Sequence, residues 1–494
     1  MKNECGESVP EILNLISIQR MRRTGLAIVA TLISAASVAA ELPTLENPST
    51  LSGTPTSASF RGGVSSDSGQ SYLPSFGSND PLSITAEIQV EPQHVGSFGN
   101  LYVLIQSGND FFMQSDDGSF SVWNLNPATL QASASDKVLT TIEPLTILEN
   151  IKLGPLGLAN AAFSIYLAYD STLNSGEIYF SGTPIALSIA AYDPLEYTSN
   201  TSQIIDTTVF DSSRDREIPV LVYLPDTISP APVVLFSHGL GGNRFNVVYL
   251  AEHWSQRGYA VFNMQHPGSD ESILDVPASE VLASFTAAAS LGNSILRIQD
   301  VSAVIDQLEI WNDDPSNALN QRLDLTRIGM SGHSFGAKTT QSVSGENMPA
   351  ISEETTDSRI KAATMFSPSI PSFGDPVAAF ADITIPWLLM TGTDDNAVIP
   401  GVGSDVEGRL AVFPALPPGN KYELVLLEGE HHAFTDHELS GFQNPRNPAH
   451  HPIIKALSTA FWDSWLSSDA SAKTWLEGAA AEAILEPGDT WQFK

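Results

Sequence analysis

The sequence predicts an α/β domain, in which a mostly parallel sheet carries helices on both faces, preceded by an all-β, sandwich-like domain. Two patterns indicate this organisation. From Pro81 to about Tyr192, short apolar runs with period two are separated by Asn, Asp, Gly and Pro, which is typical of a β-sandwich. After about residue 205, strand-like runs such as 233–239 and 259–268 alternate with helix-like segments such as 243–256. That alternation predicts parallel strands joined by helical crossovers.

These patterns divide the chain into four segments. We predict an export signal over 1–40, a flexible leader over 41–80, the sandwich-like domain over 81–200 and the α/β domain over 205–494. The leader is assigned from its richness in Ser, Gly, Pro and Thr, a composition typical of mobile segments.

The predicted export signal has the three parts that such signals need. Basic residues at Arg22 and Arg23 precede an apolar run, 25–36, that is too short to span a membrane, and small residues follow up to Ala40. We expect translation to start at Met21 and cleavage to follow Ala39 or Ala40, with an uncleaved anchor as the alternative. The signal predicts a periplasmic or extracellular location.

The charge balance excludes one class of partner. Of the 494 residues, 56 are acidic and 23 are basic, which gives a net charge of −33. Nucleic-acid binding needs clustered Lys and Arg, so we expect no nucleic-acid partner. The single cysteine, Cys5, lies in the predicted signal, and no His-rich metal motif follows, so no metal or other cofactor is expected. The oligomeric state is left open.

A candidate nucleophile lies in the second half of the chain. Gly332-His333-Ser334-Phe335-Gly336 has the form G-x-S-x-G, between a β-rich run at 327–330 and a helix-compatible run at 337–340. A serine on a tight strand-to-helix turn needs neighbours without side chains, because the helix crosses the strand closely. The context therefore favours Ser334 as a nucleophile over an ordinary turn serine.

Two later strand ends carry the groups that a serine nucleophile needs. A run at 388–393 ends in Asp394 and Asp395, and a run at 422–430 ends in His431 and His432. Serine requires a base to take its proton, and that base requires an acid to orient it. The chain order Ser, Asp, His predicts a catalytic triad, although the residues alone leave either aspartate and either histidine open.

A glycine-rich loop, Ser237 to Gly242, follows the strand at 233–239. Such a loop can direct a backbone N–H at a developing oxyanion, with the N–H of Phe335 as the second donor. The loop fits neither phosphate-binding glycine pattern, so we do not expect nucleotide binding.

Over roughly 205–470 the chain resembles the dienelactone-hydrolase-like and platelet-activating-factor-acetylhydrolase-like branch of the α/β-hydrolase superfamily. The pieces that carry the resemblance are FSHGLGG (236–242), QHPGSD (265–270), RIGMSGHSFG (327–336), TGTDD (391–395) and GEHHAF (429–434). The resemblance implies the α/β-hydrolase fold. It also implies Asp395 as the acid, His431 as the base, and the N–H groups of Leu240 and Phe335 as the oxyanion hole. Residues 81–200 lie outside the resemblance.

Together these residues predict a secreted serine hydrolase that cleaves carboxylic esters of small molecules or lipids through an acyl-enzyme, with Ser334, His431 and Asp395 as its triad. The first alternative is a lipase, a phospholipase-type acylhydrolase or a polyester hydrolase with the same triad. A non-catalytic binding protein is the second alternative. Apolar residues within 269–295 are expected to form a wall beside the active site, or an ordinary packing helix.

Overall fold

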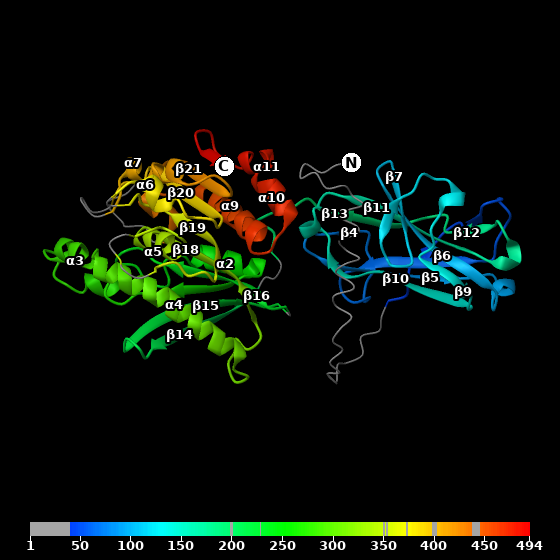
Figure 1. The fold of residues 1–494 in the computed structure, drawn as a ribbon, viewed down its shortest axis with the longest axis horizontal. Coiled ribbons are helices and arrows are strands. Elements are labelled where there is room, and N and C mark those ends of the chain that lie inside the picture. The colour runs from blue at the N-terminus through cyan, green and yellow to red at the C-terminus, as the bar shows by residue number, and fades with distance from the viewer. Residues whose placement is uncertain are drawn as a thin grey trace. The chain divides into compact units, whose positions relative to one another are not determined.

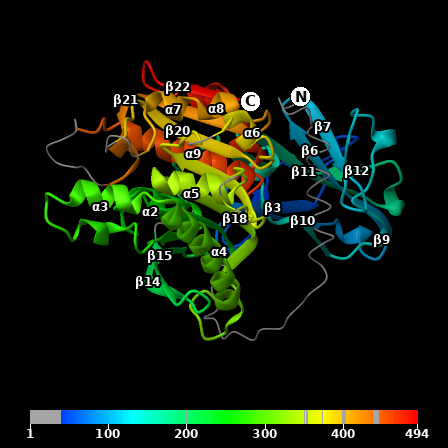
Figure 2. The ribbon, with the colours of Figure 1, turned by 60° about the vertical axis from the view of Figure 1, so that its left-hand side comes forward.

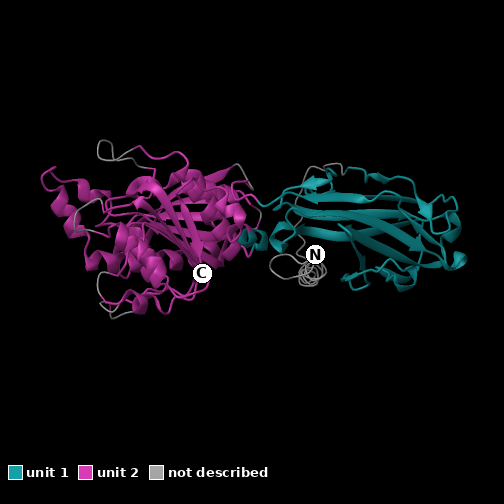
Figure 3. Ribbon diagram, turned by 90° about the horizontal axis from the view of Figure 1, so that it is seen from above, with its two compact units in different colours: residues 1–192, 469–474 teal, residues 193–468, 475–494 magenta. Residues whose placement is uncertain are grey.

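The structure is a computed structural model that describes residues 40–197, 201–227, 229–348, 351, 354–371, 374–397, 403–436 and 445–494 (Figure 1). The predicted export signal falls on residues 1–39, outside the described residues, apart from Ala40. The chain divides into two compact units, one of residues 1–192 and 469–474 and the other of residues 193–468 and 475–494 (Figure 3). The division therefore lies at 192–193, slightly before the predicted boundary at 200–205.

The N-terminal unit contains two sheets. A four-stranded antiparallel sheet has the order β1-β3-β5-β10, with strands Thr44–Leu45, Ser59–Ser65, Pro81–Gln89 and Ile142–Lys152. The second sheet has the order β2-β12-β11-β6-β7-β8. Three further strands belong to it: β13 pairs with β11, β4 pairs with β13, and β9 pairs with β6. Its strands are β2 Ser49–Thr50, β4 Ser75–Phe76, β6 Phe98–Ser107, β7 Asp110–Gln114, β8 Phe120–Val122, β9 Ala134–Val138, β11 Ala162–Asp170, β12 Ile178–Phe180 and β13 Ile185–Ile189. Alternate residues of both sheets meet in one apolar core, as period-two patterning predicts.

The prediction of a flexible leader over 41–80 is wrong, because this segment supplies β1 to β4. The glycines that suggested flexibility serve close packing instead. A Cβ at Gly62 would lie 2.4 Å from the side chain of Ile185, and a Cβ at Gly63 would lie 2.6 Å from the ring of Tyr72. Glycine in β3 therefore marks close approach to other residues and not mobility.

The C-terminal unit is built on one nine-stranded sheet of order β14-β15-β17-β16-β18-β19-β20-β21-β22. The five pairings from β17–β16 through to β20–β21 are parallel, whereas β14–β15, β15–β17 and β21–β22 are antiparallel. The strands are Ser202–Asp211, Arg216–Pro225, Ala231–Ser237 (β16), Ala260–Met264 (β17), Leu323–His333 (β18), Ile360–Phe366, Trp387–Asp394 (β20), Lys421–Glu430 (β21) and Thr490–Phe493.

The predicted fold class is therefore corrected. The structure is rich in antiparallel sheets, the sheet of the C-terminal unit is mixed, and helices make up only 26% of the described residues, which does not fit a parallel-sheet α/β-hydrolase core with helices on both faces. Strand–helix alternation predicts the direction only of strands that crossovers connect. It does not detect β14 and β15, which a short turn joins into a hairpin, or β22, which returns antiparallel at the other edge.

The described helices of this unit pack against its sheet and against one another. Within them α4 places Val301, Ile305 and Leu308 in an apolar cluster with β14 to β18, and Trp254 of α2 contacts Trp462 of α9 edge to face at 5.9 Å. A bend of 60° separates α3 from α4 (Figure 2). The α-helices are α2 Val248–Arg257, α3 Val281–Ala288, α4 Leu291–Asp313, α5 Phe335–Val343, α6 Pro376–Phe380, α7 Val406–Leu410, α8 Val412–Ala415, α9 His450–Trp465 and α11 Ala479–Glu482, with α10 Ala470–Leu476 at the division between units.

Among the described residues, no single helix has both the length and the apolar character needed to cross a membrane. Only the bent pair α3–α4 passes that test, by length and composition alone.

The edge of the sheet at β22 carries a titratable group that links its stability to pH. Glu423 of β21 is buried, and its carboxyl accepts a hydrogen bond from Nε2 of Gln492 on β22 at 2.6 Å. Burial raises the pKa of Glu423 to about 7, although Gln492 and Lys494 act in the opposite direction. The folded protein thus keeps a proton that the unfolded chain loses above its pKa of 4.5. The stability from this proton is present below pH 4.5 and is lost as pH rises through 7.

We predict that Glu423→Gln removes this dependence, because the amide keeps the shape of the side chain without titrating. Thermal unfolding from pH 4 to 8 should give a wild-type melting temperature that falls relative to that of the variant across the window. Parallel curves for the two proteins would contradict the prediction.

Candidate active site

Ser334 lies on a strained turn between β18 and α5. Its backbone has φ 57° and ψ −115°, an unfavourable conformation for a residue with a side chain. The flanking glycines are required by space: a Cβ at Gly332 would lie 2.3 Å from the carbonyl oxygen of Gly336, and a Cβ at Gly336 would lie 1.8 Å from that of Ser237. The turn keeps the Ser334 side chain partly exposed at the end of the strand, as the G-x-S-x-G pattern predicted.

The second and third predicted groups are hydrogen-bonded to each other. Nδ1 of His431, directly after β21, lies 2.7 Å from Oδ1 of Asp395, directly after β20. Asp395 is fully buried, whereas Asp394 is exposed. His432 is buried, with its Nδ1 3.6 Å from a carboxyl oxygen of Glu430. From the two adjacent pairs, Asp395 and His431 are the residues that the structure places within hydrogen-bond distance of each other.

His333 brings His431 to the turn that carries Ser334. Its Nε2 lies 2.9 Å from the carbonyl oxygen of His431, and the two rings have centroids 4.6 Å apart. The parallel pairing of β18 through β19 to β20 and β21 brings their carboxyl ends to one edge of the sheet. Within the described residues, the Ser334 hydroxyl forms no hydrogen bond to His431. Such bonds are often long before substrate binds.

Arg409 of α7 is a buried cation at this site that the sequence did not reveal. Its Nε lies 3.1 Å from Oδ1 of Asp395, and its NH1 donates to the carbonyl oxygen of Ser367 at 2.7 Å. Burial alone would raise the pKa of Asp395, but the charges of Arg409 and His431 outweigh it and lower the pKa to about 2. Asp395 therefore stays ionised at any working pH and can hold the His431 imidazole with its proton on Nδ1.

The predicted oxyanion loop lies beside the serine. A Cβ at Gly239 would lie 3.5 Å from the Cβ of Ser334, so this loop after β16 contacts the nucleophile turn. Phe335 is the first residue of α5, and such an N–H has no partner within the helix. In the described part of the chain, neither the Leu240 N–H nor the Phe335 N–H donates a hydrogen bond. Both predicted donors are thus available next to Ser334.

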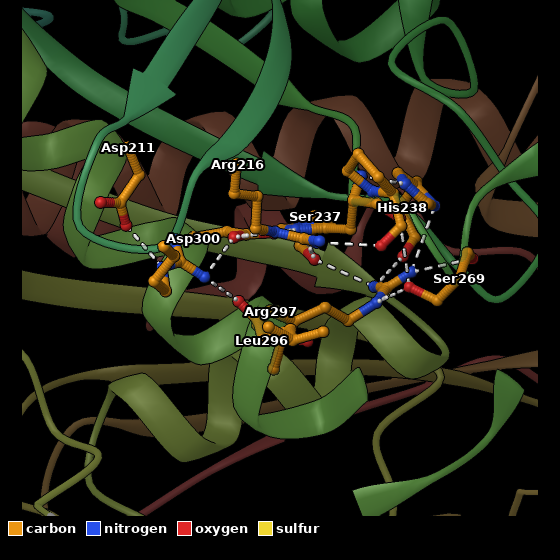
Figure 4. Close-up of polar contacts among 12 residues, drawn as sticks. Asp211, Arg216, Ser237, His238, Ser269, Leu296, Arg297 and Asp300 are labelled. Atoms are coloured by element: carbon orange, nitrogen blue, oxygen red, sulfur yellow. Dashed lines mark hydrogen bonds and ion pairs between the residues drawn. The ribbon is translucent and has the colours of Figure 1, made fainter. Parts of the chain in front are cut away.

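A second Ser-His-Asp arrangement lies behind this loop. Nε2 of His266 is 2.9 Å from Oγ of Ser237, and its Nδ1 is 3.0 Å from Oδ2 of Asp300 (Figure 4). All three side chains are fully buried. Burial lowers the pKa of His266 to about 4, and Arg297 acts in the same direction while Asp300 opposes it, so the imidazole is neutral. In the sequence analysis His266 appears only as part of the QHPGSD piece, and no local pattern marks Asp300.

The segment 269–295 lies against the oxyanion loop. A Cβ at Gly241 would lie 2.8 Å from the ring of Phe285, in α3. Leu282 and Leu291, at the start of α3 and α4, are 58% and 48% exposed. This segment therefore places apolar surface next to the loop, which is compatible both with the predicted wall and with an ordinary packing helix.

No group of three or more His, Cys, Asp or Glu side chains suited to a metal ion occurs among the described residues. Comparison of the sequence with protein-family models gives no match, and comparison with curated proteins gives none either. The resemblance stated from the motifs therefore remains a prediction, and any functional conclusion depends on the geometry of the site.

We predict that Arg409→Met destabilises the protein by about 3–5 kcal/mol, because it leaves the Asp395 carboxylate buried without its cation. Urea denaturation measures the loss. The matched test adds Asp395→Asn: the double variant should lose less than the sum of the two single losses, by at least about 1 kcal/mol. Additive losses would show that the two side chains do not interact.

Proposed function

We propose that the protein is a serine hydrolase that cleaves carboxylic esters. The observation that carries the proposal is the strained, partly exposed Ser334 beside a hydrogen-bonded His431–Asp395 pair and a loop with unused N–H groups. This set supplies a nucleophile, a base, an orienting acid and oxyanion donors, which together suffice for acyl transfer.

The proposed mechanism assigns one step to each group. Ser334 Oγ attacks the ester carbonyl carbon while His431 Nε2 accepts its proton, and Asp395 stabilises the imidazolium. The N–H groups of Leu240 and Phe335 hold the negative charge on the carbonyl oxygen of the tetrahedral intermediate. His431 then protonates the departing alcohol, and water, activated by the same base, releases the acid from Ser334.

Ser334 is preferred over Ser237 on grounds of access. A nucleophile must reach the substrate, and Ser237 is fully buried, whereas Ser334 is partly exposed. The hydroxyl of Ser237 is also committed, because it lies 2.9 Å from Nε2 of the neutral His266 and 3.3 Å from NH1 of Arg297. The buried set therefore serves as a hydrogen-bonded support for the loop and not as a second reaction centre.

The apolar surface of α3 supports an ester with an acyl chain as the substrate class. A lipase, phospholipase-type or polyester-cleaving activity would use the same groups and differs only in the substrate bound along this surface. Rates on nitrophenyl esters of increasing acyl length, a phospholipid and a polyester distinguish these activities.

We predict that Ser334→Ala lowers kcat for a soluble nitrophenyl ester by at least about 10³-fold, as triad removals do, without loss of folded structure. The matched variant Ser237→Ala removes the hydroxyl of the buried set and should keep most of the activity. An active Ser334→Ala protein would overturn the proposal, and a reversed order of the two serines would move the reaction to Ser237.

A second prediction uses the two adjacent pairs. His431→Ala should be as severe as Ser334→Ala, and His432→Ala should be mild, because His431 is the histidine whose Nδ1 lies 2.7 Å from Oδ1 of Asp395. Likewise, Asp395→Ala should cost far more turnover than Asp394→Ala. Steady-state kinetics on the same ester check both ratios. Equal losses within either pair would count against the assigned base or acid.

A further inference from the structure

Arg297 of α4 is a fully buried cation behind the oxyanion loop. Its NH1 donates to the carbonyl oxygen of His238 at 2.7 Å, its NH2 lies 3.4 Å from that of Gly239, and its Nε donates to Oγ of Ser269 at 2.8 Å (Figure 4). One guanidinium thus bonds two consecutive carbonyls of the loop and also the turn after β17.

In the part of the chain that the structure describes, no carboxylate neutralises the charge of this guanidinium by direct contact. Among the described residues, Arg297 forms no ion pair within 4.0 Å. The neighbouring Asp300 instead pairs with Arg216, whose Nε lies 2.8 Å from Oδ1 of Asp300. Burial lowers the pKa of Arg297 to about 9, although Asp300 and Asp270 oppose the shift, so the group is charged at neutral pH. A buried cation that points at backbone carbonyls fixes and polarises those peptide groups.

His238 strengthens the same arrangement. Its Nε2 accepts a hydrogen bond from the backbone N–H of His266 at 3.0 Å, so the proton of the neutral ring lies on Nδ1. Burial and the nearby Arg297 hold its pKa well below the usual range, which keeps the ring neutral. Nδ1 then donates to the carbonyl oxygen of Gly239 at 2.6 Å. The carbonyl oxygen of Gly239 therefore accepts hydrogen bonds from both Arg297 and His238.

That carbonyl belongs to the same planar peptide as the N–H of Leu240. In a trans peptide the C=O and N–H point in opposite directions, so fixing the Gly239 oxygen fixes the Leu240 N–H away from Arg297. Arg297 also contacts the residue that carries the second donor, because its guanidinium carbon lies 4.5 Å from the centroid of the Phe335 ring. A single side chain thus bonds the carbonyl of the peptide that carries one donor and contacts the ring of the residue that carries the other.

We propose that Arg297 is the positioning residue of the oxyanion hole: it orients the Leu240 peptide through the loop carbonyls and holds Phe335 through its ring. The inference rests on the proposed function, since it needs an oxyanion at Ser334. Arg297 itself does not touch the substrate. Its contribution is realised in the transition state, when the carbonyl oxygen becomes charged, and not in binding of the neutral ester.

The test compares Arg297→Met and Arg297→Lys with the wild-type full chain. Arg297→Met should lower kcat by about 10- to 100-fold with KM changed less than about 3-fold, because misplaced donors cost transition-state stabilisation only. Lysine keeps the positive charge but lacks the planar fork that bonds several carbonyls at once. The kcat of Arg297→Lys should therefore lie between those of the wild type and Arg297→Met. Arg216→Met is the matched control: it removes a half-buried arginine of the same network that does not contact the loop at 238–240, and it should keep kcat while lowering the melting temperature.

A trifluoromethyl ketone separates this inference from the proposed function. Ser334 Oγ adds to its carbonyl carbon, His431 takes the proton, and the former carbonyl oxygen becomes an oxyanion. The inhibition constant should weaken in Arg297→Met by the same factor as kcat. Failure of the ketone to inhibit the wild type would overturn the proposed function, whereas equal inhibition of wild type and variant would overturn the role of Arg297. If Arg297→Met does not fold, the same comparison on Arg297→Lys decides.

Discussion

The close approach of α5 to the end of β16 is the constraint on which the candidate site depends. A Cβ at Gly336 would lie 1.8 Å from the carbonyl oxygen of Ser237, so only glycine allows the helix to begin where it does. This contact forces the chain to turn at Ser334 with φ 57°. The cost of that conformation, of order 1–3 kcal/mol, is tolerated because the sheet and helix on either side fix it. The same contact brings the loop after β16 against the nucleophile, where its N–H groups become useful.

Burial separates the two Ser-His-Asp arrangements more clearly than hydrogen-bond geometry does. Distances of 2.9 and 3.0 Å make the Ser237–His266–Asp300 set the better formed of the two. Its members are nevertheless sealed inside the unit, and Arg297 lies against them. The Ser334 set is less complete in its hydrogen bonds but has access to solvent and to two free N–H donors. A search by hydrogen-bond geometry alone would select Ser237, whereas the proposed function, which requires access to the substrate, selects Ser334.

Residues that belong to a short sequence motif could be predicted from the sequence. Residues whose role depends on contacts with distant parts of the chain could not. Ser334 followed from glycine spacing, and the pairs Asp394/Asp395 and His431/His432 followed from strand ends in a fixed chain order, because each of these signals is local. The family resemblance implied Asp395 and His431 within those pairs. Arg409 and Arg297 lie on helices, and nothing near them in the sequence marks a buried cation. The antiparallel edges β14 and β22 and the ordered strands within 41–80 were missed for a similar reason. The direction of an edge strand and the packing around a glycine depend on residues that are distant in sequence, as Ile185 is from Gly62.

The central claim is that chemistry takes place at Ser334 and not at the buried serine. Mass spectrometry of the full chain after reaction with a fluorophosphonate tests it most directly, because the probe bonds covalently to an activated serine and the modified peptide identifies the residue. The account predicts one phosphonyl group per chain, on the peptide that contains Ser334. An unmodified chain, or a label on the peptide that contains Ser237, would contradict it.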